Sequence, residues 1–227
     1  MELNFDERRV VGTLIEKGYT TPEQYPLTMN ALVNGSSQKS CRDPVVQLDE
    51  ERVFLALDSL RKKGLVILVQ MQGSRTDRWK HRFGETLGLE DKETAVLGEL
   101  LLRGPQTDGE FRQRASRMVR LESLEDAGAI LAKLAGRTPP LAARLSPEGR
   151  RRGVLFTHGL YPAAELEELR RREATTPEEP AEAEGAPSAT PGPASALRQE
   201  VETLQAHVVA LEIRLSRIEE SLGLSSG

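Results

Sequence analysis

Residues 49–83 decide the fold. They read DEERVFLALDSLRKKGLVILVQM (49–71) and then QGSRTDRWKHRF (72–83). Val53, Leu57 and Leu60 recur at helical spacing, which predicts a helix with a single apolar face. Asp49 is a typical helix cap, and Gly64 is typical of the position just after a helix end. An apolar strand, a polar hairpin and a second strand follow, so the sequence predicts the end of a winged helix.

The last strand of this stretch alternates between basic residues and residues that suit an interior. Its basic positions are Arg78, Lys80 and Arg82, and the intervening positions are Trp79, His81 and Phe83. Such alternation predicts a half-buried strand whose cations share one face.

The preceding residues supply the rest of a winged helix. Residues 6–18 have the apolar spacing of a first helix, and residues 24–34 predict a second helix that Pro26 interrupts. A polar loop over residues 35–44 leads to a short apolar pair at 45–46. We expect this pair to form the first strand of the small sheet.

The chain then repeats this plan. GTLIEKG at 12–18 corresponds to GELLLRG at 98–104, and a third helix over residues 125–134 has its apolar positions at a constant offset from those of the first copy. Two later strands flank a second hairpin with three arginines. A duplication that matches in order of elements predicts a repeated architecture. The predicted class is mainly α with small β-wings, as two tandem winged helix-turn-helix domains, residues 1–88 and 89–172, the second including a short helix.

The remaining residues divide into two further segments. Residues 173–196 are rich in Pro, Ala and Glu, which predicts a disordered linker. Residues 197–223 predict a coiled-coil helix, because every core heptad position is apolar. These positions are Leu197, Val201, Leu204, Val208, Leu211, Leu215, Ile218 and Leu222. We expect a parallel homodimer; the alternative is an amphipathic helix that folds back onto the body of the protein.

Composition narrows the class of protein. Apolar residues make up 38% and charged residues 29% of the 227 residues. A single cysteine, Cys41, indicates a reducing compartment, and the acidic amino terminus does not resemble a secretory signal. The longest apolar run is too short to span a bilayer. We therefore expect a cytoplasmic protein. Of its 35 acidic residues, 13 lie in residues 161–227, so the net charge of −4 is no argument against nucleic acid.

Few residues suggest catalysis. The three histidines lie far apart without metal-ligand spacing, and no phosphate-binding glycine loop or nucleophile elbow is present. We therefore expect no enzyme, metal or cofactor. His81 and His158 fall at equivalent strand positions in the two copies. They are either phosphate-contacting or pH-sensitive groups, or, as is more usual, structural imidazoles. Cys41 is interpreted as an unreactive loop residue.

Basic residues on the two hairpins suggest contacts with nucleic acid. A winged helix sets its third helix in the major groove and its wing on the backbone or in the minor groove. The candidate nucleic-acid or partner contacts are Asn34, Gln38, Lys39, Arg42, Arg75, Arg78, Lys80, Arg82, Arg150, Arg151 and Arg152. Both third helices, however, begin with carboxylates, which phosphates would repel. The pattern therefore favours backbone contacts over base reading.

Three motifs carry a resemblance to a known family. They are YPLTMNALVNGSSQKSCRDPV (25–45), ELLLRGPQT (99–107) and RASRM (114–118). In these motifs the chain closely resembles the YceH-like family of uncharacterised bacterial proteins, over about residues 3–160. The resemblance implies a tandem winged-helix fold and supplies no catalytic residues. Relatives often have asparagine where this chain has Cys41, which argues against a role for the thiol.

Two functions follow as hypotheses. The first is a DNA-associated (transcriptional) regulator that binds double-stranded DNA, mainly through its basic wings. The alternative is a scaffold whose winged helices bind a protein partner, which the acidic third helices and the polar loop at 34–44 favour.

Overall fold

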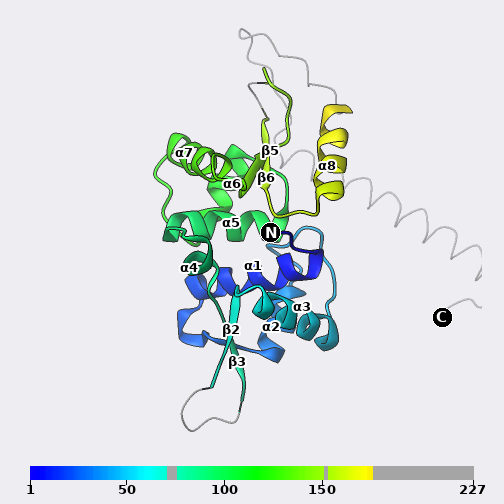
Figure 1. Ribbon diagram of the computed structural model, residues 1–227. Coiled ribbons are helices and arrows are strands. Elements are labelled where there is room, and N and C mark those ends of the chain that lie inside the picture. The colour runs from blue at the N-terminus through cyan, green and yellow to red at the C-terminus, as the bar shows by residue number, and fades with distance from the viewer. Residues whose placement is uncertain (71–75, 151–152, 176–227) are drawn as a thin grey trace, which may run out of the picture. The chain divides into compact units, whose positions relative to one another are not determined.

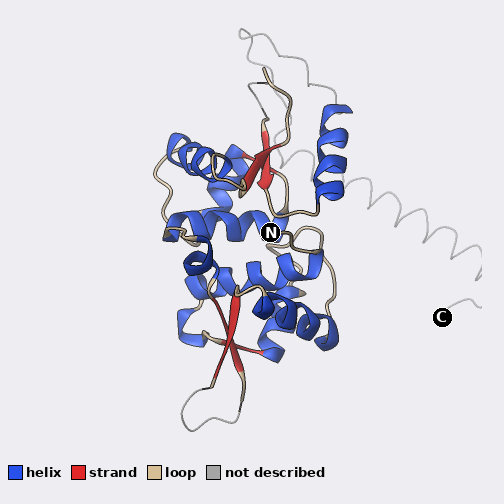
Figure 2. Ribbon diagram, in the orientation of Figure 1, coloured by secondary structure: helices blue, strands red, loops and turns tan. Residues whose placement is uncertain are grey.

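The computed structural model describes residues 1–70, 76–150 and 153–175. These residues are mainly helical, with two small antiparallel sheets (Figures 1 and 2). They belong to one compact unit. The predicted linker and coiled coil lie outside the described residues, apart from the first three residues of the linker range, which extend the last helix. No helix in the described ranges is long and apolar enough to cross a membrane.

In the first half, residues 1–88, the described residues form four α-helices and three strands. Its elements are α1 (Phe5–Thr20), the 3-10 helix η1 (Pro22–Gln24), β1 (Leu27–Thr28), α2 (Met29–Ser36), α3 (Glu50–Lys62), β2 (Val66–Val69), β3 (Arg78–His81) and α4 (Phe83–Leu87). Asp49 caps α3 by accepting a hydrogen bond from the Arg52 amide at 2.8 Å. Gly64 follows α3 with a φ of 73°, a conformation that favours glycine. Both predicted helix boundaries are confirmed.

The second half, residues 89–175, repeats much of this order. Its elements are α5 (Asp91–Arg103), β4 (Gln106–Thr107), α6 (Asp108–Ala115), α7 (Leu124–Ala135), β5 (Ala142–Arg144), β6 (Leu155–His158) and α8 (Ala163–Thr175). A capping box between Thr107 and Glu110 starts α6, and Ser123 caps α7.

The two sheets have the same topology. Their strand orders are β1-β3-β2 and β4-β6-β5, all antiparallel. Ile67 pairs with Lys80 in the first sheet, and Ala143 pairs with Thr157 in the second. Because His81 and His158 also occupy matching positions, Lys80 and Thr157 are structural counterparts.

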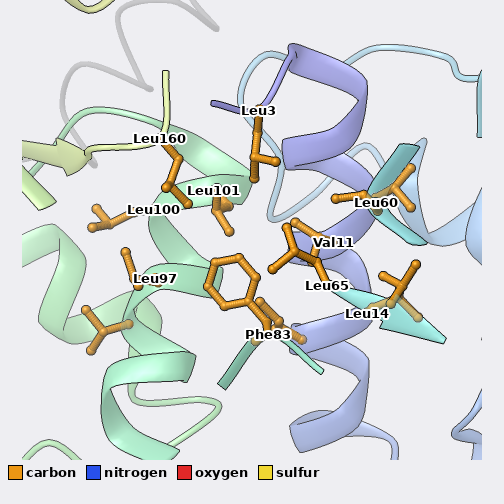
Figure 3. Packing of buried hydrophobic residues seen from close by; sticks show 14 of the residues in the cluster. Leu3, Val11, Leu14, Leu60, Leu65, Phe83, Leu97, Leu100, Leu101 and Leu160 are labelled. Atoms are coloured by element: carbon orange, nitrogen blue, oxygen red, sulfur yellow. The ribbon is translucent and has the colours of Figure 1, made fainter. Parts of the chain in front are cut away.

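A shared core joins the two halves along α1 and α5. Buried residues of both halves form one hydrophobic cluster, in which Phe83 lies between Val11 of α1 and Leu97 of α5 (Figure 3). The helices approach closely because each has a glycine at the contact. A Cβ on Gly98 would lie 2.6 Å from Ile15 Cγ2. Side-chain interdigitation of this kind makes the relative position of the halves sensitive to small changes of volume.

Two local predictions were wrong. Val45 and Val46 do not form a strand; they lie in the loop before α3, and Val45 is 52% exposed. The first strand is instead β1, inside the segment predicted as a broken helix, where η1, β1 and α2 follow one another. The predicted last strand ends at His81, because Phe83 already begins α4.

Candidate functional site

Two buried arginines hold the polar loop at 34–44 from inside. Arg42 donates from Nε and Nη2 to the Gly35 carbonyl at 3.0 and 2.7 Å. Arg9 donates to the carbonyls of Ser36 at 3.1 Å and Pro44 at 2.6 Å. Arg42 is 4% exposed and Arg9 is 1% exposed. The expectation that Arg42 contacts a partner is therefore replaced by a structural role.

Arg42 also belongs to an ionic cluster between the halves, which comprises Glu16, Arg42, Glu99, Arg103 and Arg117. Arg42 pairs with Glu16 at 2.5 Å, and Arg117 bridges Glu16 to Glu99, the latter at 3.0 Å. Arg103 approaches Glu99 at 2.8 Å. Burial raises the pKa of Glu16, but the hydrogen bond and charge of Arg42, with Arg117, bring it below its usual value. Glu16 is therefore ionised, and both carboxylates are buried and paired with arginines.

The sequence reasoning missed Glu16, Glu99 and Arg117. A signal was present, since each glutamate interrupts an apolar helical run, in GTLIEKG and GELLLRG respectively. Carboxylates are almost never fully buried unless they are paired. Arg117 lies in the RASRM motif, so all three motifs of the family resemblance converge on this cluster.

Asn34 and Gln38 line a polar hollow, which we name the α2 hollow. It has a volume of about 330 Å³ and lies among the end of α1, η1, β1 and α2. Its polar lining includes Lys17, Gln24 and Asn30, and Asn34 donates to Asn30 at 3.4 Å. The described residues that line it include no carboxylate. The hollow thus offers amide and hydroxyl groups around one cation.

The first hairpin has one exposed cation without a partner in the described ranges. Lys80 is exposed on β3 and makes no ion pair there. Arg78 donates to the Pro26 carbonyl at 2.9 Å, and Arg82 pairs with Glu85 at 2.9 Å. Lys39, in the loop after α2, is also exposed. The predicted contact Arg75 lies outside the described residues.

The second hairpin is instead bound to the protein itself. Arg150 pairs with Glu173 of α8 at 2.5 Å, and Ser146 donates to the same carboxylate at 2.8 Å. Thr157, the counterpart of Lys80, has 0% exposure and donates to Tyr161 at 3.2 Å. Arg151 and Arg152 lie outside the described residues. Arg150 therefore fastens the hairpin to α8, which lies beside it (Figure 1).

The third helix of the first half exposes acidic and apolar groups together. Phe54 and Leu55 are 54% and 60% exposed, and Glu50 and Glu51 lie near them at the start of α3. This face is unsuited to a phosphate backbone, because its leading charges are negative.

Both strand histidines have structural surroundings. His158 is 1% exposed, stacks on Tyr161 with ring centroids 3.8 Å apart, and accepts from the Leu160 amide at 3.2 Å. Burial, and then the charge of Arg8, lower the pKa of His158 well below its usual value. Burial lowers the pKa of His81 to about 4. Neutral, packed imidazoles fit the structural interpretation. Across residues 1–70, 76–150 and 153–175, no group of three or more His, Cys, Asp or Glu could hold a metal ion.

Sequence comparisons place these features within a family. A family model described as "Protein of unknown function, DUF480" matches residues 3–151. A UPF0502 protein of Geotalea uraniireducens (strain Rf4) is 49% identical over 158 residues, covering 70% of this chain and 72% of the relative. A UPF0502 protein of Acidovorax sp. (strain JS42) is 37% identical over 227 residues, covering 98% and 95%. The second match extends across the residues that follow α8.

Proposed function

Because the chain belongs to the DUF480 (UPF0502) family of uncharacterised bacterial proteins, we propose its function from its own geometry: a non-enzymatic, cytoplasmic, DNA-associated regulator built from two tandem winged helices. The repeated order of helices and hairpin, with the same sheet topology in each half, supports the winged-helix assignment. In this proposal α3 and α7 are the third helices, and β2–β3 and β5–β6 form the wings.

One observation carries the DNA proposal: the two wings are not equivalent. Lys80 is exposed on the first wing, whereas its counterpart Thr157 is buried and donates a hydrogen bond to Tyr161. The first wing also lies on the side of α1 opposite α5, away from the contact between the halves (Figure 1). DNA therefore contacts the first wing, and the second wing together with α8 serves to hold the fold.

The charges favour backbone contact over base reading. An ammonium such as that of Lys80 can neutralise a phosphate and release a counterion, which makes affinity depend on salt. Glu50 and Glu51 at the start of α3 oppose insertion of that end into a groove. Binding is therefore weakly selective for sequence.

Fluorescence anisotropy on generic duplex DNA at low and moderate salt tests this proposal. We expect Lys80→Glu to abolish most of the binding, because it inverts the charge at the contact. The matched control is Lys62→Glu, which makes the same change of charge on α3, where Lys62 is exposed and paired with Asp58. No binding by the wild type at low salt, or equal losses in the two variants, would refute the assignment.

Pairing of two chains through the heptads of residues 197–223 is also part of the proposal. Eight apolar core positions support it. Light scattering of the full chain is expected to give the mass of a dimer. Truncation after Glu173 is expected to lower the mass by more than the removed residues account for. A monomeric full chain at high micromolar concentration would exclude this mode of pairing.

A second function is favoured by the exposed apolar residues of α3. Phe54 and Leu55 beside acidic groups suit a protein partner better than a phosphate backbone. If the protein is a scaffold, Phe54→Ser with Leu55→Ser should remove a stoichiometric co-purifying protein and leave DNA affinity unchanged. An unchanged partner in this double variant would reject α3 as its docking face.

A further inference from the structure

The duplication provides an internal comparison for the α2 hollow. Helices α2 and α6 begin alike: Thr28 and Thr107 are their caps, and each hydroxyl accepts from the amide three residues later, at 3.3 Å in both. Thr28 and Thr107 also lie in the matching strands β1 and β4. Ala31 therefore corresponds to Glu110, and Gly35 corresponds to Arg114.

In the second half, these two positions are filled by an ion pair. Glu110 accepts from the Thr107 amide at 3.1 Å and pairs with Arg114 at 3.0 Å. Arg114 also donates to Gln106 at 2.9 Å. Alanine and glycine replace this pair in the first half. Ala31 and Gly35 both line the α2 hollow, and Ala31 is exposed. A Cβ on Gly35 would lie 2.9 Å from Thr13 Cγ2 and 3.8 Å from Lys17 Cε. The position of Glu110 is therefore left open in the first half, and that of Arg114 is taken by side chains of α1.

The cation beside this space also loses its carboxylate. Lys17 corresponds to Arg103, which lies 2.8 Å from Glu99, but the counterpart of Glu99 is Thr13. The Lys17 ammonium makes no ion pair or hydrogen bond with another residue in the described ranges. Its neighbour Glu16 is already engaged by Arg42 and Arg117. The first half thus keeps this positive charge and lacks the carboxylate of Glu99 that pairs with it in the second half. It also lacks the pair of Glu110 with Arg114.

We propose that the α2 hollow binds a small oxyanion, a phosphate or carboxylate group, where the carboxylate of Glu110 lies in the second half. Lys17 supplies the charge, and the amides of Asn30, Asn34 and Gln38 hydrogen-bond the oxygens and the polar remainder of the ligand. A volume of about 330 Å³ admits a group larger than phosphate alone. The described residues that line the site include none of the first wing, so the site goes beyond the proposed DNA contact. Because a free anion and a backbone phosphate offer the same oxygens, the source of the oxyanion has to be tested.

Heteronuclear NMR of the isotope-labelled full chain tests the proposal, with inorganic phosphate as the probe at constant ionic strength. We expect saturable shifts of the side-chain amide signals of Asn30, Asn34 and Gln38. Lys17→Met should weaken the affinity about tenfold or more, as expected for loss of a charge-assisted hydrogen bond. The control Lys62→Met should leave it unchanged. Shifts that do not saturate, or equal affinities in the two variants, would overturn the proposal.

A second variant gives the first half the carboxylate that the second half carries at the corresponding position. Ala31→Glu is expected to abolish the phosphate shifts, because its carboxylate can bond Thr28 and Lys17 as Glu110 bonds Thr107 and Arg114. A melting temperature no lower than that of the wild type shows that this variant is folded. Retention of phosphate binding in folded Ala31→Glu would contradict the placement of the site.

The source of the oxyanion is decided by competition. If phosphate displaces duplex DNA from the wild type, the site holds a backbone phosphate; if phosphate binds without displacement, the ligand is a free anion. Lys80→Glu separates this inference from the proposed function, because it should lose DNA and keep the phosphate shifts. Loss of the phosphate shifts in Lys80→Glu would place the anion on the wing instead of in the hollow.

Discussion

Replacing Arg42 by methionine should destabilise the whole protein. The substitution keeps an extended side chain and removes the charge that compensates Glu16. Arg42 has a fully buried side chain, lies 2.5 Å from Glu16 and makes two hydrogen bonds to Gly35. Without it, Glu16 retains one partner, Arg117, and the Gly35 carbonyl loses the two hydrogen bonds that Arg42 donates. The ionic cluster between the halves would be left with an incompletely paired buried carboxylate.

The expected loss follows from the burial of the pair. Breaking a buried ion pair by removing one partner costs about 3–5 kcal/mol. Native proteins have a free energy of unfolding of roughly 5–15 kcal/mol, so the loss is a large fraction of the total. At roughly 2–4 °C per kcal/mol for a chain of this size, the melting temperature should fall by about 6–20 °C.

Urea unfolding followed by circular dichroism measures this loss. The control is Arg61→Met, which removes an exposed partner of Asp58 and should cost under about 1 kcal/mol. Adding Glu16→Gln to Arg42→Met should cost less than the sum of the single changes, because both members of one pair are removed. A loss below about 1 kcal/mol for Arg42→Met would refute the structural role of the cluster.

Two further predictions concern the core and the pH. Gly98→Ala should cost about 1–3 kcal/mol of stability, because its Cβ would lie 2.6 Å from Ile15. The control Gly128→Ala on α7, where a Cβ would meet nothing within 4 Å, should stabilise the protein by about 0.5–1 kcal/mol. Thermal melts that rank the two variants otherwise would reject the close contact between α1 and α5. Burial lowers the pKa of His158, so the unfolded chain binds the proton more readily than the folded protein. Stability should therefore decrease as the pH falls below 6.5, by about 1.4 kcal/mol per pH unit for one histidine. Urea melts at several pH values should show a weaker dependence of stability on pH for His158→Asn, and an unchanged dependence would exclude His158 as its source.

Periodic patterns in the sequence predicted most of the helices. Local features can be recognised in a sequence, and α3 is defined by three of them: its apolar stripe, its cap Asp49 and the Gly64 that ends it. The strand β1 was missed because two residues carry no periodicity, and Pro26 beside them favoured a broken helix. Two adjacent β-branched residues, Val45 and Val46, were mistaken for that strand.

The site was less predictable, because its partners are distant in the sequence. Arg42 lies in a polar loop, so the sequence suggests a surface contact. Its burial depends on Glu16, 26 residues away, and on packing between the halves. Arg150 was likewise interpreted as a wing cation, and its partner Glu173 lies in a helix whose docking no local pattern indicates. By contrast, the difference between Ala31 and Glu110 is visible once the two copies are aligned through their capping threonines.

The proposed function assigns backbone contacts to the first wing and none to the second, and the salt dependence of DNA binding tests this assignment. The logarithm of the binding constant against the logarithm of salt concentration should be a falling line for the wild type. Its slope should become shallower by about 0.9 for Lys80→Ala, as expected for one lost phosphate contact, and should not change for Arg144→Ala on β5. A wild-type affinity independent of salt, or a slope that changes with Arg144 and not with Lys80, would contradict this assignment of the two wings.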